Sequence, residues 1–382
     1  MEIIKRILLK IPHEIRLIFI VFFISRLILT TVGVYSRQTA SEELKNWYEW
    51  HYSDKEWLDV WSVWDSGWYL DIAQNGYSLV LKSDLPKRTC CGQNNLVFLP
   101  LYPMSIRFLG YIIGNYHNAG IILSNSFLII SCFLLYKIAL KDFGEKEAKL
   151  AIVYLLAFPT SFILSSVFSE SLLLMLILFF FYSIRNKKWY SSSIFGYFAA
   201  LTKITGVLLL PIAIVEFIKE KGTNLKKFLS FLLIPSGLLT YMAYTLYKFD
   251  DAFVYFTVRK YSWGVYLSNP LTTLFQMANS NNPLIKLILI IFLIYMLVNI
   301  LISLSKIPIS YKIMSILFTA IPLFSGIEAM KGFLRVSTIV FPIVLYLAIK
   351  TSKIRNTFIM PITLMLVQVF LMFFYSNGLL FI

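Results

Sequence analysis

Long apolar segments separated by short polar ones make up most of the chain. A helix needs roughly 20 apolar residues to cross the hydrocarbon core of a bilayer. Runs of suitable length occupy residues 17–34, 119–140, 228–247, 284–304, 312–327, 333–350 and 356–376. Shorter or interrupted runs occupy residues 150–167, 170–184, 190–201 and 205–218. The pattern therefore predicts about eleven membrane-crossing helices.

These runs lack the alternation of apolar and polar residues that is typical of a transmembrane β-strand. Because backbone groups in lipid must satisfy their own hydrogen bonds, a bundle of helices is the remaining solution. We see no internal repeat and no low-complexity linker, so we expect residues 1–382 to form a single all-α, multi-pass membrane domain. The first apolar run follows a basic segment without a small-residue cleavage site, and we expect it to be retained as a helix.

Composition and charge agree with a membrane protein. Hydrophobic residues make up 58% of the chain and charged residues only 14%, too few to cover a soluble protein of this size. The net charge of +15 would suit nucleic acid, but Lys and Arg gather in short loops, as the positive-inside rule requires of cytoplasmic loops. We therefore expect a cytoplasmic amino terminus, an outer carboxyl terminus and no nucleic-acid partner. The basic loops contain Lys5, Arg6, Lys10, Arg16, Lys141, Lys146, Lys149, Arg185, Lys187, Lys188, Lys219, Lys221, Lys226, Lys227, Lys350, Lys353 and Arg355.

Two long polar segments, residues 35–97 and 248–283, are predicted to lie on the outer side of the membrane. The first holds nine of the twenty acidic residues and six of the eight tryptophans. Tryptophans in such a loop either anchor the protein in the membrane interface or stack against sugar rings. The stretch FLPLYP follows at residues 98–103, and its two prolines disfavour a helix interior. We expect it to be an interfacial or re-entrant piece and not a crossing.

The motif WDSGWYLDIAQNGY, residues 64–77, combines aromatic and acidic side chains within the outer segment. One explanation makes Asp65 the N-cap of a short helix that Asn75 and Gly76 end. The other is catalytic. On a helix, Asp65, Trp68 and Tyr69 share one face, whereas Asp71 points elsewhere. One carboxylate flanked by aromatics suits a general base that removes a proton from a sugar hydroxyl, and not the carboxylate pair of a glycoside hydrolase.

Charged residues from distant segments are predicted to reach the same outer side. We expect acids and bases from these segments to gather beneath the tryptophan-rich loop. The residues are Glu170 in the turn SSVFSES, Lys203 in the break LTKITG, Glu328, Lys331 and Arg335 in the loop GIEAMKGFLR, and Asp250, Asp251, Arg259 and Lys260 in the second outer segment.

An outward-facing transferase would use a sugar linked to a lipid phosphate, because nucleotide sugars are cytoplasmic. The departing phosphate needs positive charge directed at it, and Lys203 and Arg335 are the candidates. A lysine near a helix end also commonly extends its amine towards the membrane surface, so a purely structural Lys203 stays an alternative. No metal is predicted, because the three histidines have no ligand spacing and the basic side chains can supply the charge. The adjacent Cys90 and Cys91 indicate neither a disulfide framework nor a thiol nucleophile.

Together these motifs resemble the PIG-V mannosyltransferases and their bacterial relatives, within the GT-C glycosyltransferase superfamily. WDSGWYLDIAQNGY with the following FLPLYP resembles the family's aromatic-Asp, IA, GY and Phe/Pro-rich pattern. The segments FPTSFILSSVFSESLLLML (158–176), LTKITGVLLLP (201–211) and FLRVSTIVFP (333–342) resemble three further family segments in the same order. The chain departs from the pattern at Trp68, where many relatives have His, and at Lys203, where Arg is usual.

The resemblance implies inverting transfer of a hexose, expected to be mannose, from a polyprenyl-phosphate donor to a lipid- or glycan-type acceptor on the outer or lumenal face, without a cofactor. It places Asp65 as the base and Lys203 and Arg335 at the donor phosphate. Sugar and acceptor contacts are expected from Trp64, Trp68, Tyr69, Tyr77 and Glu170. The location would be the cytoplasmic membrane or the endoplasmic reticulum, and a partner subunit is plausible for the family.

Three other interpretations remain open, and one of them is a structural membrane protein in which Asp65 only caps a helix. A lipid-linked oligosaccharide ligase or polymerase would keep the enzyme class but transfer a larger group. A flippase or transporter would need pathway charges inside several spans or inverted repeats. The sequence shows few charges within apolar runs, namely Arg26, Lys203 and Glu216, and this favours the transferase.

Overall fold

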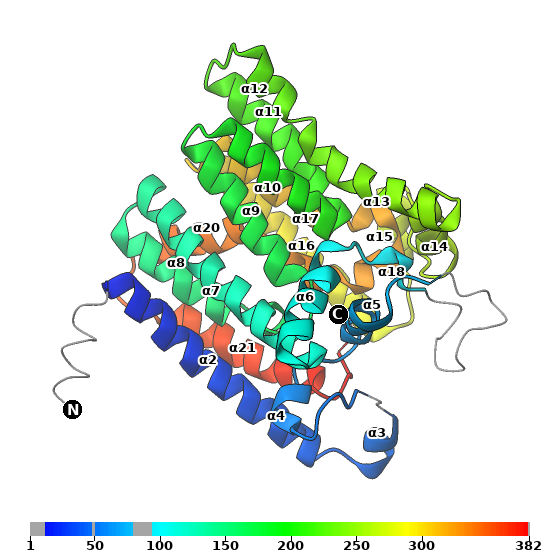
Figure 1. The fold of residues 1–382 in the computed structure, drawn as a ribbon. Coiled ribbons are helices and arrows are strands. Elements are labelled where there is room, and N and C mark those ends of the chain that lie inside the picture. The colour runs from blue at the N-terminus through cyan, green and yellow to red at the C-terminus, as the bar shows by residue number, and fades with distance from the viewer. Residues whose placement is uncertain (1–11, 48–49, 79–93, 381–382) are drawn as a thin grey trace.

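The computed structural model describes residues 12–47, 50–78 and 94–380, and within these ranges the regular structure is helical, with no strand (Figure 1). Cys90, Cys91 and the basic residues Lys5, Arg6 and Lys10 lie outside the described residues. The long and medium helices are α2 (His13–Gln38), α6 (Leu101–Ile113), α7 (Tyr116–Asp142), α8 (Glu145–Ala157), α9 (Glu170–Arg185), α10 (Trp189–Thr202), α11 (Leu209–Lys219), α13 (Leu233–Phe249), α16 (Pro283–Leu304), α17 (Ile309–Ala320), α20 (Phe341–Thr351) and α21 (Ile359–Tyr375).

Short helices and 3₁₀ turns connect these elements. The short helices are α3 (Glu42–Trp47), α4 (Glu56–Asp59), α5 (Ser66–Asn75), α12 (Leu225–Ser230), α14 (Val254–Tyr261), α15 (Pro270–Ala278), α18 (Ile327–Lys331) and α19 (Phe333–Ser337). The 3₁₀ turns are η2 (Asn95–Val97), η3 (Ser161–Leu164), η4 (Ile204–Leu208) and η5 (Leu323–Ser325).

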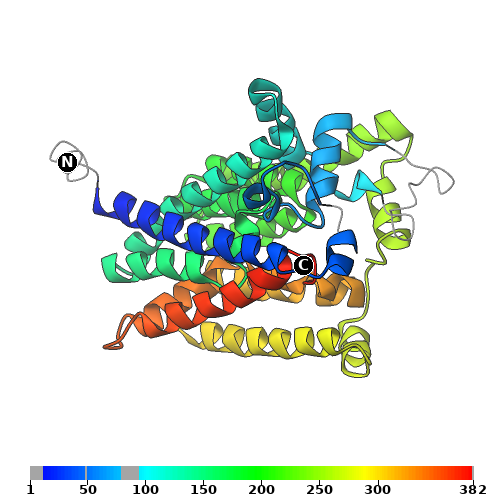
Figure 2. The same ribbon diagram turned by 90° about the horizontal axis from the view of Figure 1, so that it is seen from below.

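Helix α9 lies at the centre of the bundle. Its sequence is apolar nearly all round, which is typical of a helix enclosed by other helices, and most of its residues are buried. It packs between α7 and α10, while α10 also packs against α13, α8 against α20, and α2 against α21 (Figures 1 and 2). The central position of α9 matters for the site, because its first residue is Glu170.

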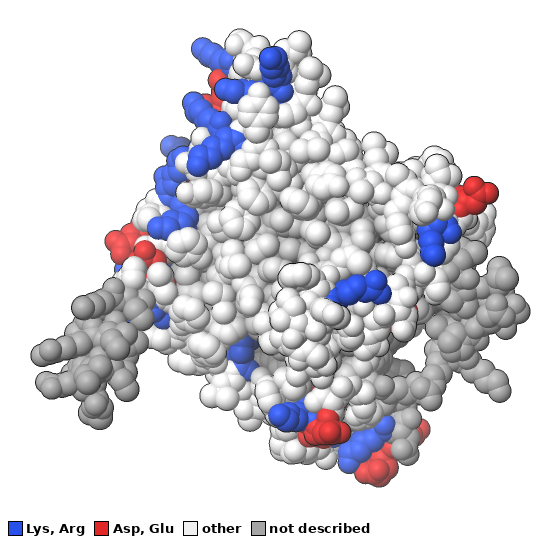
Figure 3. Space-filling model, in the orientation of Figure 1, with Lys and Arg blue, Asp and Glu red and all other residues white. Residues whose placement is uncertain are grey.

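The two ends of the bundle differ in charge. Lys and Arg side chains gather along one edge, over the connections α7–α8, α9–α10 and α11–α12, which we call the basic end (Figure 3). The short helices α3, α4, α5, α14, α15 and α18 lie at the opposite end, which we call the loop end (Figures 1 and 2). Between them the surface is almost free of charge in this view, and helices α2, α16 and α21 expose large apolar side chains such as Leu27, Leu297 and Phe370. Such a surface fits contact with lipid tails.

Among the described residues, four helical segments are long and apolar enough to cross a membrane: His13–Gln38, Tyr116–Asp142, Leu225–Phe249 and Pro283–Leu304. They correspond to four of the predicted runs. The total of about eleven crossings stays a prediction. Helix α6, with 13 residues, would extend about 20 Å, short of the hydrocarbon core.

Besides the run 228–247, which divides into α12 and α13, and the run 205–218, which begins in η4, three predicted runs are interrupted near the loop end. The run 333–350 divides into α19 and α20, and Pro342 occupies the first turn of α20, where its missing N–H is harmless. The run 150–167 is α-helical only to Ala157, because Phe158 precedes Pro159 and takes an extended conformation. The run 312–327 stops being α-helical after Ala320, two residues before Pro322. Each of these three interruptions provides non-helical backbone there.

Candidate functional site

Four charged side chains from four separate segments meet where α5, α9, α10 and α19 come together. Arg335 of α19 donates through one terminal nitrogen to Asp65, the residue before α5, and its Nε lies 2.8 Å from Glu170 Oε1. Lys203, between α10 and η4, donates to the same Glu170 oxygen at 2.5 Å. We call these four residues the ionic cluster. Two acids and two bases balance its formal charge.

Asp65 occupies the N-cap position of α5 but does not cap the helix. Its side chain makes no capping hydrogen bond, and its backbone is helical, with φ −61° and ψ −11°. The carboxylate pairs with Arg335 instead and remains 17% exposed. Trp64, directly before it, has φ 54°, a left-handed conformation that is costly for a bulky L-residue. Local strain beside a charged group that does not serve the helix is typical of a functional position.

Glu170 begins α9 with a side chain that is fully buried. A buried carboxylate is tolerable only when cations and hydrogen bonds replace its water, and Lys203 and Arg335 do so here. Within the described residues its second oxygen, Oε2, has no hydrogen-bond partner. Glu170 therefore joins the two cations through Oε1, and its contact with a sugar stays a prediction.

Lys203 reaches the cluster because the chain breaks between α10 and η4. Its backbone is extended, with φ −155° and ψ 141°, and its side chain is 20% exposed. Gly206 makes the break possible, since a Cβ there would lie 2.3 Å from the backbone carbon of Ala199. The guanidinium of Arg335 lies 5.4 Å from the ring centre of Phe168, close enough for a cation–π contact.

The buried, non-helical segment between α8 and α9 holds the cluster in place. Backbone groups here need partners from elsewhere in the fold. The Val167 amide donates to the Trp61 carbonyl at 3.0 Å, and Arg26 donates to the Ser161 carbonyl at 3.3 Å. Thr338, near Arg335, donates to the Thr160 hydroxyl at 2.7 Å. The buried Arg26 thus has a structural task.

Two aromatic side chains, Trp68 and Tyr69, share the Asp65 face of α5, and Tyr69 lies close to the charged residues of the cluster. Tyr69 is buried, its hydroxyl is 2.8 Å from that of Ser169, and burial raises the pKa of this phenol well above its ordinary value. Trp68 stacks on Phe98 with ring centres 6.1 Å apart and lies edge-on to Trp263 at 6.0 Å. Trp263, the single tryptophan of the second outer segment, was not singled out from the sequence. Its placement depends on a long-range hydrogen bond from its ring nitrogen to the Asn94 carbonyl, at 3.3 Å.

Other predicted residues do not join the ionic cluster. Trp64 packs against Trp50, and Tyr77 donates to the Phe98 carbonyl at 2.5 Å and packs beside Tyr241. Asp71 points away, as its spacing predicts, and accepts hydrogen bonds from Asn75 and Asn95.

Other acids and bases of the outer segments belong to elements at the loop end but pair outside the ionic cluster. Glu328 and Lys331 pair with each other at the surface, 2.7 Å apart. Asp251 accepts a hydrogen bond from the Phe253 amide, and Arg259 donates to Tyr255. Residues close in sequence satisfy these side chains, so nothing draws them towards the cluster.

Among the described residues, no group of three or more His, Cys, Asp and Glu side chains is arranged to hold a metal ion. The three acids near the cluster's segments serve separate partners: Asp65 and Glu170 bind cations, and Asp71 binds amides.

Comparisons with known proteins give a fold and no family. No protein-family model matches the chain, and no curated protein matches its sequence. Among solved structures, the chain is similar to ArnT from Cupriavidus metallidurans, determined bound to undecaprenyl phosphate, with a TM-score of 0.52 and 10% sequence identity. The match covers 95% of this chain and 76% of that one. The chain therefore shares the all-helical fold of that structure.

Proposed function

We propose that this chain is an integral-membrane glycosyltransferase that moves a hexose from a polyprenyl-phosphate donor to a lipid- or glycan-type acceptor at the loop end. The observation that carries the proposal is the ionic cluster, which combines one partly exposed carboxylate, Asp65, with two cations, Lys203 and Arg335. A general base and a phosphate-binding pair are what such a transfer needs. The fold supports it, since the ArnT structure contains a polyprenyl phosphate.

In the proposed reaction the acceptor hydroxyl attacks the anomeric carbon of the donor while Asp65 takes the hydroxyl proton. The bond between that carbon and the phosphate oxygen breaks on the opposite face, so the configuration inverts. The polyprenyl phosphate leaves with the bonding electron pair, and Lys203 and Arg335 stabilise its charge. Trp68, Tyr69 and Trp263 exclude water that would otherwise hydrolyse the donor.

The resting ion pairs suggest an order of events. Arg335 contacts both carboxylates, so an arriving phosphate competes with Asp65 for the guanidinium. Phosphate binds a guanidinium through charge-assisted hydrogen bonds, which are stronger than neutral ones. Donor binding would thus release Asp65 from its cation and make it available to the acceptor.

Mannose as the sugar follows from the resemblance of WDSGWYLDIAQNGY and FLPLYP to the PIG-V mannosyltransferases. The positive charge is proposed to come from Lys203 and Arg335, with no metal required. Activity in membranes treated with a chelator should then equal the untreated activity, and restoration of lost activity by Mn²⁺ or Mg²⁺ would refute the metal-free proposal.

The decisive experiment is a transfer assay in membranes with radiolabelled polyprenyl-phosphate mannose and its glucose analogue. We expect transfer with the wild type, mannose preferred, and a fall of about 10²–10⁴-fold for Asp65→Asn, because a general base contributes about that much. Glu328→Gln is the matched control, since this carboxylate pairs with Lys331 at the surface.

Folding must be equal in the three proteins, judged by thermal unfolding in detergent. No transfer from either donor by folded wild-type protein in native membranes would overturn the proposal. Full activity of Asp65→Asn would leave the proposed transferase function intact but refute the role of Asp65 as the general base.

A further inference from the structure

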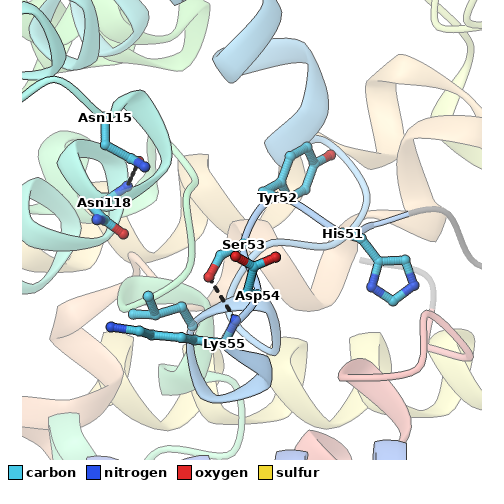
Figure 4. A pocket seen from close by; sticks show the side chains of 8 residues that line it. His51, Tyr52, Ser53, Asp54, Lys55, Asn115 and Asn118 are labelled. Atoms are coloured by element: carbon cyan, nitrogen blue, oxygen red, sulfur yellow. Dashed lines mark hydrogen bonds between the residues drawn. The ribbon is translucent and has the colours of Figure 1, made fainter.

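A polar cavity lies on the side of α5 that faces away from the ionic cluster. It consists of two adjoining pockets, a larger one of about 530 Å³ (Figure 4) and a smaller one of about 310 Å³, and both are lined by Tyr52 and Asn115. Residues 51–55 form one side of the larger part and the start of α7 the other. The smaller part is lined by Gly67, Leu70, Asp71 and Gln74 of α5. On a helix these four residues share the face opposite Asp65, Trp68 and Tyr69.

The lining offers unused hydrogen-bonding groups of both kinds. Within the described chain, the side chains of Asp54, Lys55, Gln74 and Asn118 make no hydrogen bond or ion pair. A carboxylate only accepts, an ammonium only donates, and an amide does both. The cavity therefore combines acceptors and donors without an excess of positive charge. This lining favours a neutral polyhydroxylated ligand over a phosphate or an apolar one.

The buried side chains of Asp59 and His117 hold Tyr52, which lines both pockets, in place. The Tyr52 amide donates to Asp59 Oδ1 at 3.2 Å, and the Tyr52 ring centre lies 5.4 Å from that of His117. His117 Nε2 is 2.7 Å from the Ser62 hydroxyl, and Asp59 and His117 are 1% and 4% exposed. Gly67 leaves room for the ring, since a Cβ there would lie 2.9 Å from the Tyr52 hydroxyl. An aromatic ring fixed beside free hydrogen-bonding groups is a common arrangement for sugars.

His117 supplies an independent sign of a ligand. It lines the smaller part of the cavity, and its Nδ1 is buried without a partner among the described residues. An unpaired buried nitrogen costs free energy unless a water or ligand group reaches it.

We propose that this cavity binds an oligosaccharide, and that it holds the sugars of the acceptor while a terminal hydroxyl reaches Asp65 on the other face of α5. A helix with its side chains is about 10–12 Å across, so a saccharide that passes around it must contain more than one sugar unit. The role as acceptor site rests on the proposed transferase function, whereas saccharide binding does not. The acceptor class is then a glycan or glycolipid with at least two sugars.

The test measures binding of mannotriose and maltotriose to the full-length protein in detergent by saturation-transfer NMR titration. We expect the wild type and Glu328→Gln, whose carboxylate pairs with Lys331 at the surface, to bind at least one trisaccharide with equal affinity. The double variant Gln74→Ala/Asn118→Ala should bind about tenfold more weakly, as expected when two ligand hydrogen bonds are lost. The matched control is Gln276→Ala/Asn279→Ala, which removes the same two residue types from the exposed surface of α15 and its end.

The outcomes separate this proposal from the transferase proposal. Absence of binding to both trisaccharides, or equal binding by the two double variants, overturns the cavity proposal even if transfer activity is found. If the variants show the expected binding pattern but the wild type has no transfer activity, the cavity is a saccharide site and the proposed transferase function is refuted. With transfer established, Gln74→Ala/Asn118→Ala should raise the acceptor KM about tenfold and leave the donor KM and kcat unchanged.

Discussion

Asp65 shows how one carboxylate at a helix start can be mistaken for a cap. Its sequence position fits an N-cap, but the side chain pairs with Arg335 and leaves the helix amides to other partners. The separation is 270 residues along the chain, so no local pattern contains the pair. What local spacing does show is the face of α5, which correctly places Trp68 and Tyr69 with Asp65 and turns Asp71 away.

Substitution of Lys203 tests whether the cluster binds the phosphate of the sugar donor. We expect Lys203→Ala to raise the donor KM about tenfold or more, because a charge-assisted hydrogen bond to phosphate is worth roughly 1.5–3 kcal/mol. Lys203→Arg should retain activity, since Arg also binds phosphate. Lys331→Ala is the matched control, because Lys331 likewise pairs with a glutamate but at the exposed surface. An equal rise in donor and acceptor KM for Lys203→Ala would contradict the phosphate role.

At the scale of elements, breaks in the helices carry the site. Asp65, Glu170 and Lys203 lie at helix ends, and Arg335 lies in the short helix α19 between η5 and α20. Non-helical backbone at membrane depth survives only where protein encloses it, and the 158–169 segment is enclosed by Trp61, Arg26 and Thr338. The apolar runs predicted the helices but passed over these breaks, because hydropathy does not register a change of backbone direction within an apolar stretch.

Gly206 allows a prediction at this scale. Gly206→Ala should lower the free energy of unfolding by about 1–3 kcal/mol or more, because the added methyl would overlap the α10 backbone. It should also displace Lys203 and weaken donor binding. Gly332→Ala is the control, since its nearest contact would be an ordinary 3.7 Å. Thermal unfolding of the two variants in detergent measures the difference. Equal stability would contradict the prediction and mean that the backbone between α10 and η4 shifts to accommodate the added methyl group.

At the scale of the whole molecule, α9 links two ionic groups at opposite ends of the bundle. Glu170 begins it in the ionic cluster, and Arg185 ends it between Asp142 and Glu216, at 2.8 and 2.9 Å. Tyr311 of α17 also donates to Asp142. The sequence placed Arg185 in a predicted cytoplasmic basic loop. In the structure its ion pairs also connect α9 to α7 and α11.

We expect Arg185→Ala to destabilise the protein by about 3–5 kcal/mol, because it leaves two buried carboxylates without their cation. Lys187→Ala, which removes an exposed pair with Glu220, should cost about 0–1 kcal/mol. The comparison is made by thermal unfolding in detergent at one lipid concentration. Similar losses for the two variants would show that the Arg185 pairs are screened like surface pairs.

The charge difference between the ends predicts an orientation. The basic end should face the cytoplasm and the loop end the outside. Single cysteines at Glu56→Cys and Lys353→Cys, with Cys90 and Cys91 replaced by serine, report this, because Cys132 is buried. A membrane-impermeant maleimide should label position 56 in intact cells and position 353 only after permeabilisation. The reverse pattern would invert the topology and place the ionic cluster in the cytoplasm.

The amino-acid sequence by itself determined the all-helical class, the four long apolar helices and a set of charged candidates that includes the four that meet. Hydrophobic periodicity and lipid leave little choice of secondary structure, and charges in apolar surroundings are too costly to be placed without partners. Only the tertiary structure decided which charges pair, that Trp263 and Phe98 pack against Trp68, and that a polar cavity lies behind α5. Those contacts join residues tens to hundreds of positions apart, and their formation depends on how the helices pack rather than on any local preference.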